Sequence, residues 1–264
     1  MANKETKSPL KAKPLRNPGQ SVRERRFDLA YEKILAPVLM TIMTGYWAVM
    51  EWVAYFFPQV RKPWMMTIAT LAVGAWAVWQ IKRYWPEITR LRLAEDGEKA
   101  VGQLLESLRG GGYKVFHDVI GNDFNVDHVV IGPAGVYAIE TKTWSKPAKG
   151  SPKIHFDGVT LRANGLLPDR DPIVQAKAQA QWLKSLLMES TGKEFPVHPV
   201  VLFPGWFIEA PRESLKDIWV LEAKGLSKFL ENAAKRLEPD DVHMASFHLM
   251  QFVCAQEQRI ADSA

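Results

Sequence analysis

The chain has 264 residues and one cysteine, Cys254, which excludes an internal disulfide and a cysteine-based metal site. This length accommodates one ordinary domain with additional elements, or two small domains. The formal net charge is +5, and residues 1–33 carry all of it, with nine Lys and Arg against four Asp and Glu. The basic pI therefore describes the N-terminal segment and not the remainder of the chain.

Residues 1–33 are predicted to be a basic, disordered tail on the cytoplasmic side. Residues 1–20 are rich in Lys, Pro and Asn and poor in apolar side chains, which disfavours a packed core. Two interpretations stay open: a solvated tail, or an arm that lies on anionic lipid or nucleic acid.

Residues 34–85 are predicted to form a transmembrane helical hairpin with spans at about 34–57 and 64–81. The first run contains one charged residue, Glu51, and the second contains none. At about 1.5 Å per residue, both runs are of the length needed to cross a hydrocarbon core of roughly 30 Å. Uninterrupted apolar character on all faces argues against the alternative, a pair of buried helices in a soluble protein.

The charges flanking the two runs predict the orientation. The N-terminal flank is basic, and Lys82, Arg83, Arg90 and Arg92 follow the second run. By the positive-inside rule, both termini are expected in the cytoplasm, which describes an integral membrane protein with two spans and the lipid bilayer as a partner. No feature of the sequence predicts an oligomeric state.

Residues 90–264 have the pattern of a soluble α/β domain with closing C-terminal helices. Apolar residues at helical spacing precede Gly110-Gly111-Gly112, and strand-like and helical runs follow. The predicted strands are 113–119, 126–131, 136–141, 153–156, 159–162, 197–203 and 218–221. The predicted helices are a long one from Asp171-Pro172 to about Glu189, followed by 226–236 and 240–259.

Three residues on two neighbouring predicted strands carry the candidate chemistry. Glu140 and Lys142 are two positions apart, so their side chains share a face of the strand. The sequence Gly132-Pro133-Ala134-Gly135 predicts a hairpin turn, which brings Asp127 roughly opposite Glu140. Neighbouring carboxylates repel, and a divalent cation such as Mg²⁺ or Mn²⁺ removes that cost. Asp127 and Glu140 are therefore predicted metal ligands, and Lys142 a group that stabilises charge on a phosphate.

Around this trio, residues 96–205 resemble the nuclease-related domain (NERD), a branch of the PD-(D/E)XK nuclease superfamily. The resemblance lies in Gly97-Glu98, in the stretch from Asp127 to Tyr137, in Glu140-Thr141-Lys142 and in the stretch from Asp171 to Gln175. It implies a restriction-endonuclease-like α-β-β-β-α-β core, Mg²⁺ dependence and a nucleic-acid substrate. It also implies that Glu98 and Gln175 join Asp127, Glu140 and Lys142 as catalytic residues.

The stretch after Lys142 contains further candidates for nucleic-acid contact. Trp144 is expected to stack on a base, and Lys146 and Lys149 to neutralise phosphates. A solvated basic loop is the alternative.

The predicted function is a membrane-anchored, metal-dependent nuclease that hydrolyses phosphodiester bonds on the cytoplasmic side, with DNA favoured. The alternative is a catalytically inactive, membrane-bound module that binds nucleic acid or a protein.

Overall fold

The computed structural model describes residues 15–56, 63–121, 124–146, 151–168 and 171–263. These residues divide into two compact units. The hairpin unit comprises Ser21–Glu95, and the folded unit comprises Asp96 to the C-terminus together with the N-terminal segment up to Gln20.

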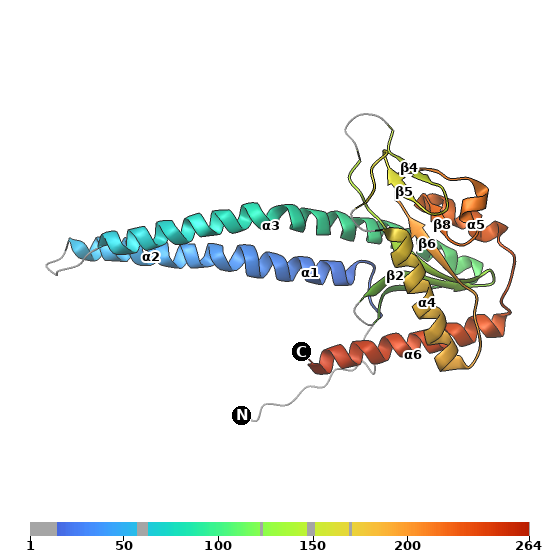
Figure 1. Ribbon diagram of the computed structural model, residues 1–264. Coiled ribbons are helices and arrows are strands. Elements are labelled where there is room, and N and C mark those ends of the chain that lie inside the picture. The colour runs from blue at the N-terminus through green and yellow to red at the C-terminus, as the bar shows by residue number, and fades with distance from the viewer. Residues whose placement is uncertain (1–14, 57–62, 122–123, 147–150, 169–170, 264) are drawn as a thin grey trace, which may run out of the picture. The chain divides into compact units, whose positions relative to one another are not determined.

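Two antiparallel helical arms form the hairpin unit (Figure 1). One arm consists of α1 (Gln20–Ala30), the π-helical turn η1 (Tyr31–Leu35) and α2 (Ala36–Tyr55), and the other is the first part of α3 (Pro63–Glu106). Between the arms, Trp52 Nε1 donates to Thr67 Oγ1 at 2.8 Å.

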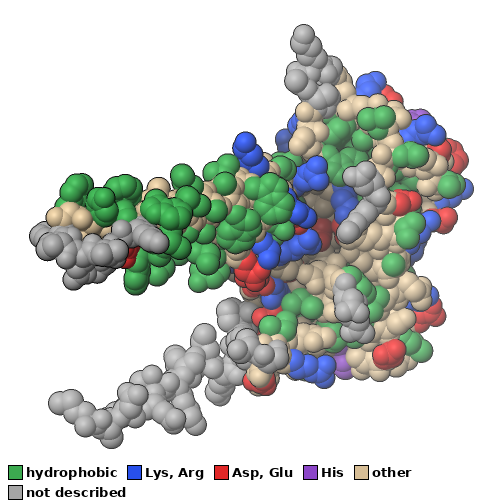
Figure 2. Space-filling view, turned by 60° about the vertical axis from the view of Figure 1, so that its left-hand side comes forward, with side chains coloured by type: hydrophobic (Ala, Val, Ile, Leu, Met, Phe, Trp, Pro, Cys, Tyr) green, Lys and Arg blue, Asp and Glu red, His purple; other side chains and the backbone are tan. Residues whose placement is uncertain are grey.

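Among the residues that the structure describes, two helices, Gln20–Tyr55 and Pro63–Gly111, are long and apolar enough to cross a membrane. In the most apolar 18-residue stretch of each helix, only 11% and 6% of the residues, respectively, are buried. Hydrophobic side chains cover much of the hairpin surface (Figure 2). Length and composition alone are weak evidence for membrane spans, because core helices of soluble proteins meet the same criteria.

The helices of the hairpin unit extend beyond the predicted boundaries. The segment predicted as a disordered tail is helical from Gln20, and its basic side chains pair with acids of α3: Arg25 with Glu87 at 3.3 Å and Arg26 with Glu95 at 2.9 Å. These pairings between distant residues favour a helix that composition did not indicate. Residues 1–14 of the predicted tail lie outside the described residues.

The second apolar run and the first helix of the α/β region are one helix, α3, of 44 residues. The sequence between them is rich in good helix formers such as Leu, Arg, Ala and Glu, so helical structure persists. Pro86 lies within this helix and does not end it.

A five-stranded mixed sheet is the centre of the folded unit, and its strand order is β1-β2-β3-β6-β8. Its strands are β1 (Lys114–Ile120), β2 (Asn125–Gly132), β3 (Gly135–Thr141), β6 (Val197–Leu202) and β8 (Trp219–Leu221). The first three strands are antiparallel, and β6 and β8 extend the sheet in parallel with β3. The mixed α/β fold expected from the sequence is confirmed.

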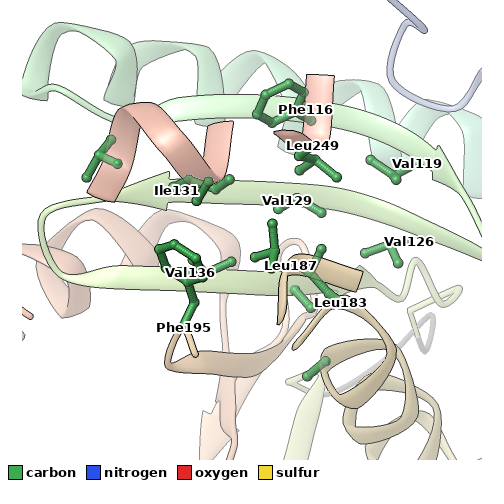
Figure 3. Packing of buried hydrophobic residues seen from close by; sticks show 14 of the residues in the cluster. Phe116, Val119, Val126, Val129, Ile131, Val136, Leu183, Leu187, Phe195 and Leu249 are labelled. Atoms are coloured by element: carbon green, nitrogen blue, oxygen red, sulfur yellow. The ribbon is translucent and has the colours of Figure 1, made fainter. Parts of the chain in front are cut away.

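Helices cover both faces of this sheet. On one face lie α4 (Pro172–Thr191) and α6 (Pro239–Ser263), whose Leu183, Leu187 and Leu249 pack against side chains from β1, β2 and β3 (Figure 3). On the other face lie the end of α3, with Val101 and Leu105, and α5 (Leu226–Asn232). Short 3₁₀ turns complete the unit: η2 (Ser107–Gly111), η3 (Arg212–Leu215) and η4 (Ala223–Gly225).

A second, three-stranded sheet has the order β5-β4-β7. Its strands are β4 (Lys153–Phe156), β5 (Leu161–Ala163) and β7 (Phe207–Glu209). The sequence did not predict β7, because three residues are too few for a period-2 pattern to be recognised. A separate apolar cluster under this sheet includes Phe156, Phe203 and Trp206.

Three histidines, each partly or fully buried, make the free energy of unfolding depend on pH. Burial lowers the pKa of His117 and of His198, the latter to about 4, and places the pKa of His128 well below 6.5. His117 Nδ1 lies 2.9 Å from His128 Nδ1, so one of these nitrogens donates and the other accepts. All three side chains therefore favour the neutral form in the folded state.

We expect the free energy of unfolding to fall as the pH is lowered from about 6.5 towards 4. In that window the unfolded chain binds protons that the folded chain excludes, at about 1.4 kcal/mol per pH unit for each fully affected group. Chemical denaturation at a series of pH values measures this slope. The variant His198→Gln should have a shallower slope than His155→Gln, which removes an exposed histidine. Equal slopes would contradict the prediction.

Candidate active site

The candidate site forms where β2 and β3 run side by side beneath α4. His128 pairs with Ile139 in the antiparallel ladder. The same register places Asp127 across from Glu140, as the turn sequence predicted. Glu140 follows Val136 and Ala138 on alternate positions of β3, and these two side chains belong to the core beneath α4. The carboxylate of Glu140 therefore faces α4.

Lys142 lies between Glu140 and Gln175. Its Nζ donates to Glu140 Oε1 and to Gln175 Oε1, the latter at 2.9 Å. Glu140 is only 2% exposed, so the ammonium group supplies a counter-charge to a buried carboxylate. Gln175 reaches the site because α4 begins at Pro172, where the N-cap residue Asp171 accepts from Ile173 N at 2.8 Å.

Asp127 is held against the end of β3, where its Oδ2 accepts from Thr141 N at 2.7 Å. The pKa of Asp127 is raised well above its usual value, first by burial and then by the negative charges of Glu140 and Glu98. The hydrogen bond from Thr141 N and the charge of Lys142 oppose this rise in part. A carboxylate next to two others is a candidate functional group.

Glu98 lies on α3 and is 5% exposed. Its charge contributes to the raised pKa of Asp127, so α3 brings a third carboxylate close to the site. The structure thus gathers all five predicted catalytic residues: Glu98, Asp127, Glu140, Lys142 and Gln175.

Gln179 is a site residue that the sequence analysis missed. It is 1% exposed, and its Nε2 donates to Glu140 Oε2 at 2.6 Å and to Asn125 O at 2.8 Å. It therefore orients Glu140 relative to the start of β2. The signal was present in the sequence, because Gln179 lies one helical turn after Gln175 on the same face of α4.

Gly97 allows α3 to approach the segment after β3. A Cβ atom at this position would lie 1.6 Å from Thr143 Oγ1 and 2.7 Å from Thr143 Cβ. Because Thr143 is flanked by Lys142 and Trp144, and Glu98 follows Gly97, this close approach fixes the spacing of site residues on two elements.

We expect Gly97→Ala to destabilise the folded unit by about 1–3 kcal/mol, since the added methyl group forces Thr143 to move. Thermal unfolding measures the effect. Gly225→Ala is the matched control, because nothing lies within 4 Å of its Cβ position and Gly225 has an ordinary φ of −73°. Equal shifts for both variants would show that the contact between Gly97 and Thr143 is unimportant.

The predicted nucleic-acid contacts lie beside this site in part. Trp144 is half-buried, with its ring centroid 4.9 Å from that of Phe203 and 6.3 Å from that of Trp206. Lys146 is exposed, whereas Lys149 lies outside the described residues.

A divalent cation at this site would require oxygen ligands from the surrounding side chains. In the described part of the chain, no group of three or more His, Cys, Asp or Glu side chains could hold a metal ion. Mg²⁺, however, is commonly bound through one or two carboxylates with waters and phosphate oxygens. Asp127 and Glu140 provide two carboxylates. Gln179 Oε1 is buried and has no hydrogen-bond partner among the described residues. A water molecule bound to a hydrated cation could donate a hydrogen bond to this oxygen. The residues fit Mg²⁺ held by few protein ligands.

Comparison with known proteins supports the resemblance noted in the sequence. Residues 93–204 match the family model of the nuclease-related domain. All five predicted catalytic residues lie within the stretch that matches this model, as does Gln179. The matching stretch also contains the strands β1 to β6, together with α4.

Other comparisons found little. No curated protein matches the chain. The solved structure entitled "The structure of Pyrococcus Furiosus SfsA in complex with Ca2+" is similar at 16% sequence identity and a TM-score of 0.25. The aligned part covers 50% of this chain and 55% of that chain, so the match spans about half the length of each.

Proposed function

We propose that the folded unit is a divalent-metal-dependent nuclease that hydrolyses phosphodiester bonds, with DNA as the favoured substrate. The observation that carries this proposal is the pairing of Asp127 and Glu140 on adjacent strands with Lys142 beside them. The match of residues 93–204 to the nuclease-related domain supports the same class of activity.

In this proposal Asp127 and Glu140 hold Mg²⁺ or Mn²⁺. The bound cation supplies Lewis-acid polarisation of the phosphoryl group and activation of a water. Binding it also removes the repulsion that raises the pKa of Asp127.

The surrounding side chains orient the reacting groups. Lys142 Nζ presents positive charge where negative charge develops on the phosphate. Gln175 positions Lys142, and Gln179 positions Glu140, each through a hydrogen bond. Glu98 contributes negative charge that strengthens the attraction of the site for a cation.

Cleavage of plasmid and linear DNA by the full-length chain, purified in a mild detergent, tests this proposal. We expect cleavage with Mg²⁺ or Mn²⁺ and none with EDTA. Glu140→Gln should reduce the rate by on the order of 10²- to 10³-fold or more, whereas Glu213→Gln, which alters an exposed acid, should not change it. Cleavage undiminished in Glu140→Gln would reject the proposal. Metal-independent binding without cleavage would favour the inactive binding module.

We also propose that the hairpin unit anchors the chain in a membrane as two spans, with both termini in the cytoplasm. The low burial of the apolar windows supports this proposal, because core helices of soluble proteins are mostly buried. Reporter fusions at residue 264 test the orientation. An external C-terminus would contradict it.

A further inference from the structure

A pocket of about 590 Å³ opens beside Lys142. Its lining residues come from the segment after β3, from the turn after β5 and from the approach to β7: Lys142, Trp144, Ser145, Asn164, Leu167 and Trp206 are among them. Its size lies within the range of small-molecule sites, roughly 300–1,000 Å³. The shared residue Lys142 makes the pocket continuous with the candidate active site.

The segment that follows β3 carries Trp144 to this pocket. Lys142 and Trp144 lie beyond Thr141, the last residue of β3, and both line the pocket. Thr143, which lies between them, meets Gly97 of α3. Since Glu140 precedes Lys142, the order along the chain is metal ligand, phosphate-binding cation and aromatic ring.

The ring of Trp144 is held in place from behind. It packs on Phe203, and Trp206 Nε1 donates to Trp144 O at 3.3 Å. Trp206 is itself 3% exposed, so it supports Trp144 and offers little surface of its own. A rigid, half-exposed indole loses little conformational entropy when a flat ligand stacks on it.

The remaining walls match a nucleobase with its attached phosphates. Leu166 and Leu167 are 75% and 65% exposed, and they offer apolar contact. Asn164 and Ser145 add an amide and a hydroxyl for the polar edge of a base. Lys146 Nζ would lie 2.5 Å from a Cβ built on Gly205, the neighbour of Trp206, which places a second cation next to the pocket.

We propose that this pocket binds an unpaired nucleobase of the strand whose phosphate lies at Lys142, so that the substrate is single-stranded nucleic acid or a frayed end. A base within a duplex is stacked and paired, and placing it in a pocket costs its unpairing and unstacking. An unpaired strand enters at no such cost. This inference rests on the proposed function, since it assigns the strand to the same phosphate-binding centre.

Binding in EDTA tests the inference separately from cleavage. Fluorescein-labelled oligothymidylate and the same strand annealed to oligoadenylate are titrated with the full-length chain, and anisotropy is recorded. We expect the single strand to bind more tightly. Trp144→Leu should weaken single-strand binding by roughly 5- to 150-fold, the loss of one base–aromatic stack, while Phe247→Leu, which alters an exposed aromatic of α6, should leave it unchanged.

Two further measurements keep the test valid if Trp144→Leu unfolds. Leu167→Ala truncates an exposed wall residue, so it should preserve the thermal midpoint and still weaken single-strand binding. An oligothymidylate carrying 5-iododeoxyuridine should photocrosslink to the peptide that contains Trp144.

Equal affinity for single strand and duplex, or crosslinks only outside the pocket, would overturn the inference. Cleavage without strand preference rejects this inference alone, whereas strand preference without metal-dependent cleavage rejects only the proposed activity.

Discussion

Replacing Arg16 with Met is expected to destabilise the folded unit by about 3–5 kcal/mol, the cost of breaking a buried ion pair by removing one partner. Arg16 is 6% exposed, although it lies in a basic segment that composition indicates to be solvated. Its Nε donates to Asp118 Oδ2 at 2.6 Å, and its Nη1 donates to Glu257 Oε1 at 2.9 Å. The substitution leaves two buried carboxylates without this cation.

Asp118 makes this cluster sensitive to the loss of Arg16. Its backbone has a φ of +50°, in the left-handed region that non-glycine residues rarely adopt. Arg16 and Asn125 Nδ2, at 3.3 Å from Asp118 Oδ1, bind its carboxylate in this conformation. The backbone carbonyl of Asn125 in turn accepts from Gln179 Nε2, so the cluster borders strand β2 of the candidate site.

Denaturant unfolding of the full-length chain measures the effect of Arg16→Met. Lys153→Met is the matched control, because it breaks an exposed ion pair with Glu209, and such pairs contribute about 0–1 kcal/mol. Similar free-energy losses for both variants would show that the Arg16 cluster has no special role. The contacts of Arg16 also have a practical consequence: a fragment that begins near residue 90 lacks this cation, so activity should be measured on the full chain.

Asp127→Asn is expected to abolish metal-dependent cleavage and, in the absence of metal, to stabilise the fold. The pKa of Asp127 is raised in the folded state, so stability falls as pH rises from the ordinary carboxyl pKa to the raised one, and ionised Asp127 destabilises the fold at higher pH. Asn removes the charge, and its side-chain oxygen can still accept from Thr141 N. We expect a rate lower by on the order of 10³-fold or more, together with a higher thermal midpoint in EDTA.

The two halves of this prediction have different measurements. DNA cleavage with Mn²⁺ gives the rate, and thermal unfolding in EDTA near pH 7.5 gives the stability. A variant that is both inactive and less stable than the wild type would indicate that Asp127 is a structural residue whose loss disrupts the strands.

Local patterns predicted the part of the site that lies on neighbouring strands. The turn from Gly132 to Gly135 fixed which residues of β2 and β3 face each other, and alternation then assigned Glu140 and Lys142 to one side. The Asp-Pro start of α4 was equally local, and it placed Gln175 at the first turn. In each case, residues close in sequence determine the geometry.

What the sequence did not predict depends on contacts between distant residues. Arg16 and Glu257 are 241 positions apart, so no window of sequence pairs them. The spacing of Gln179 from Gln175 indicates only a shared face of α4, and its role becomes visible with its contact to Glu140. The continuity of α3 through Pro86 was also not predicted, because proline ordinarily favours the ends of helices.

Calorimetric titration of the full-length chain with Mn²⁺ and with Mg²⁺ tests the central claim most directly, because the claim is that Asp127 and Glu140 together hold a divalent cation. We predict saturable binding to the wild type, accompanied by a rise in thermal midpoint. Asp127→Asn and Glu140→Gln should abolish both, whereas Glu213→Gln should keep them. Absence of binding to the wild type, or binding that persists in both site variants, would contradict the account.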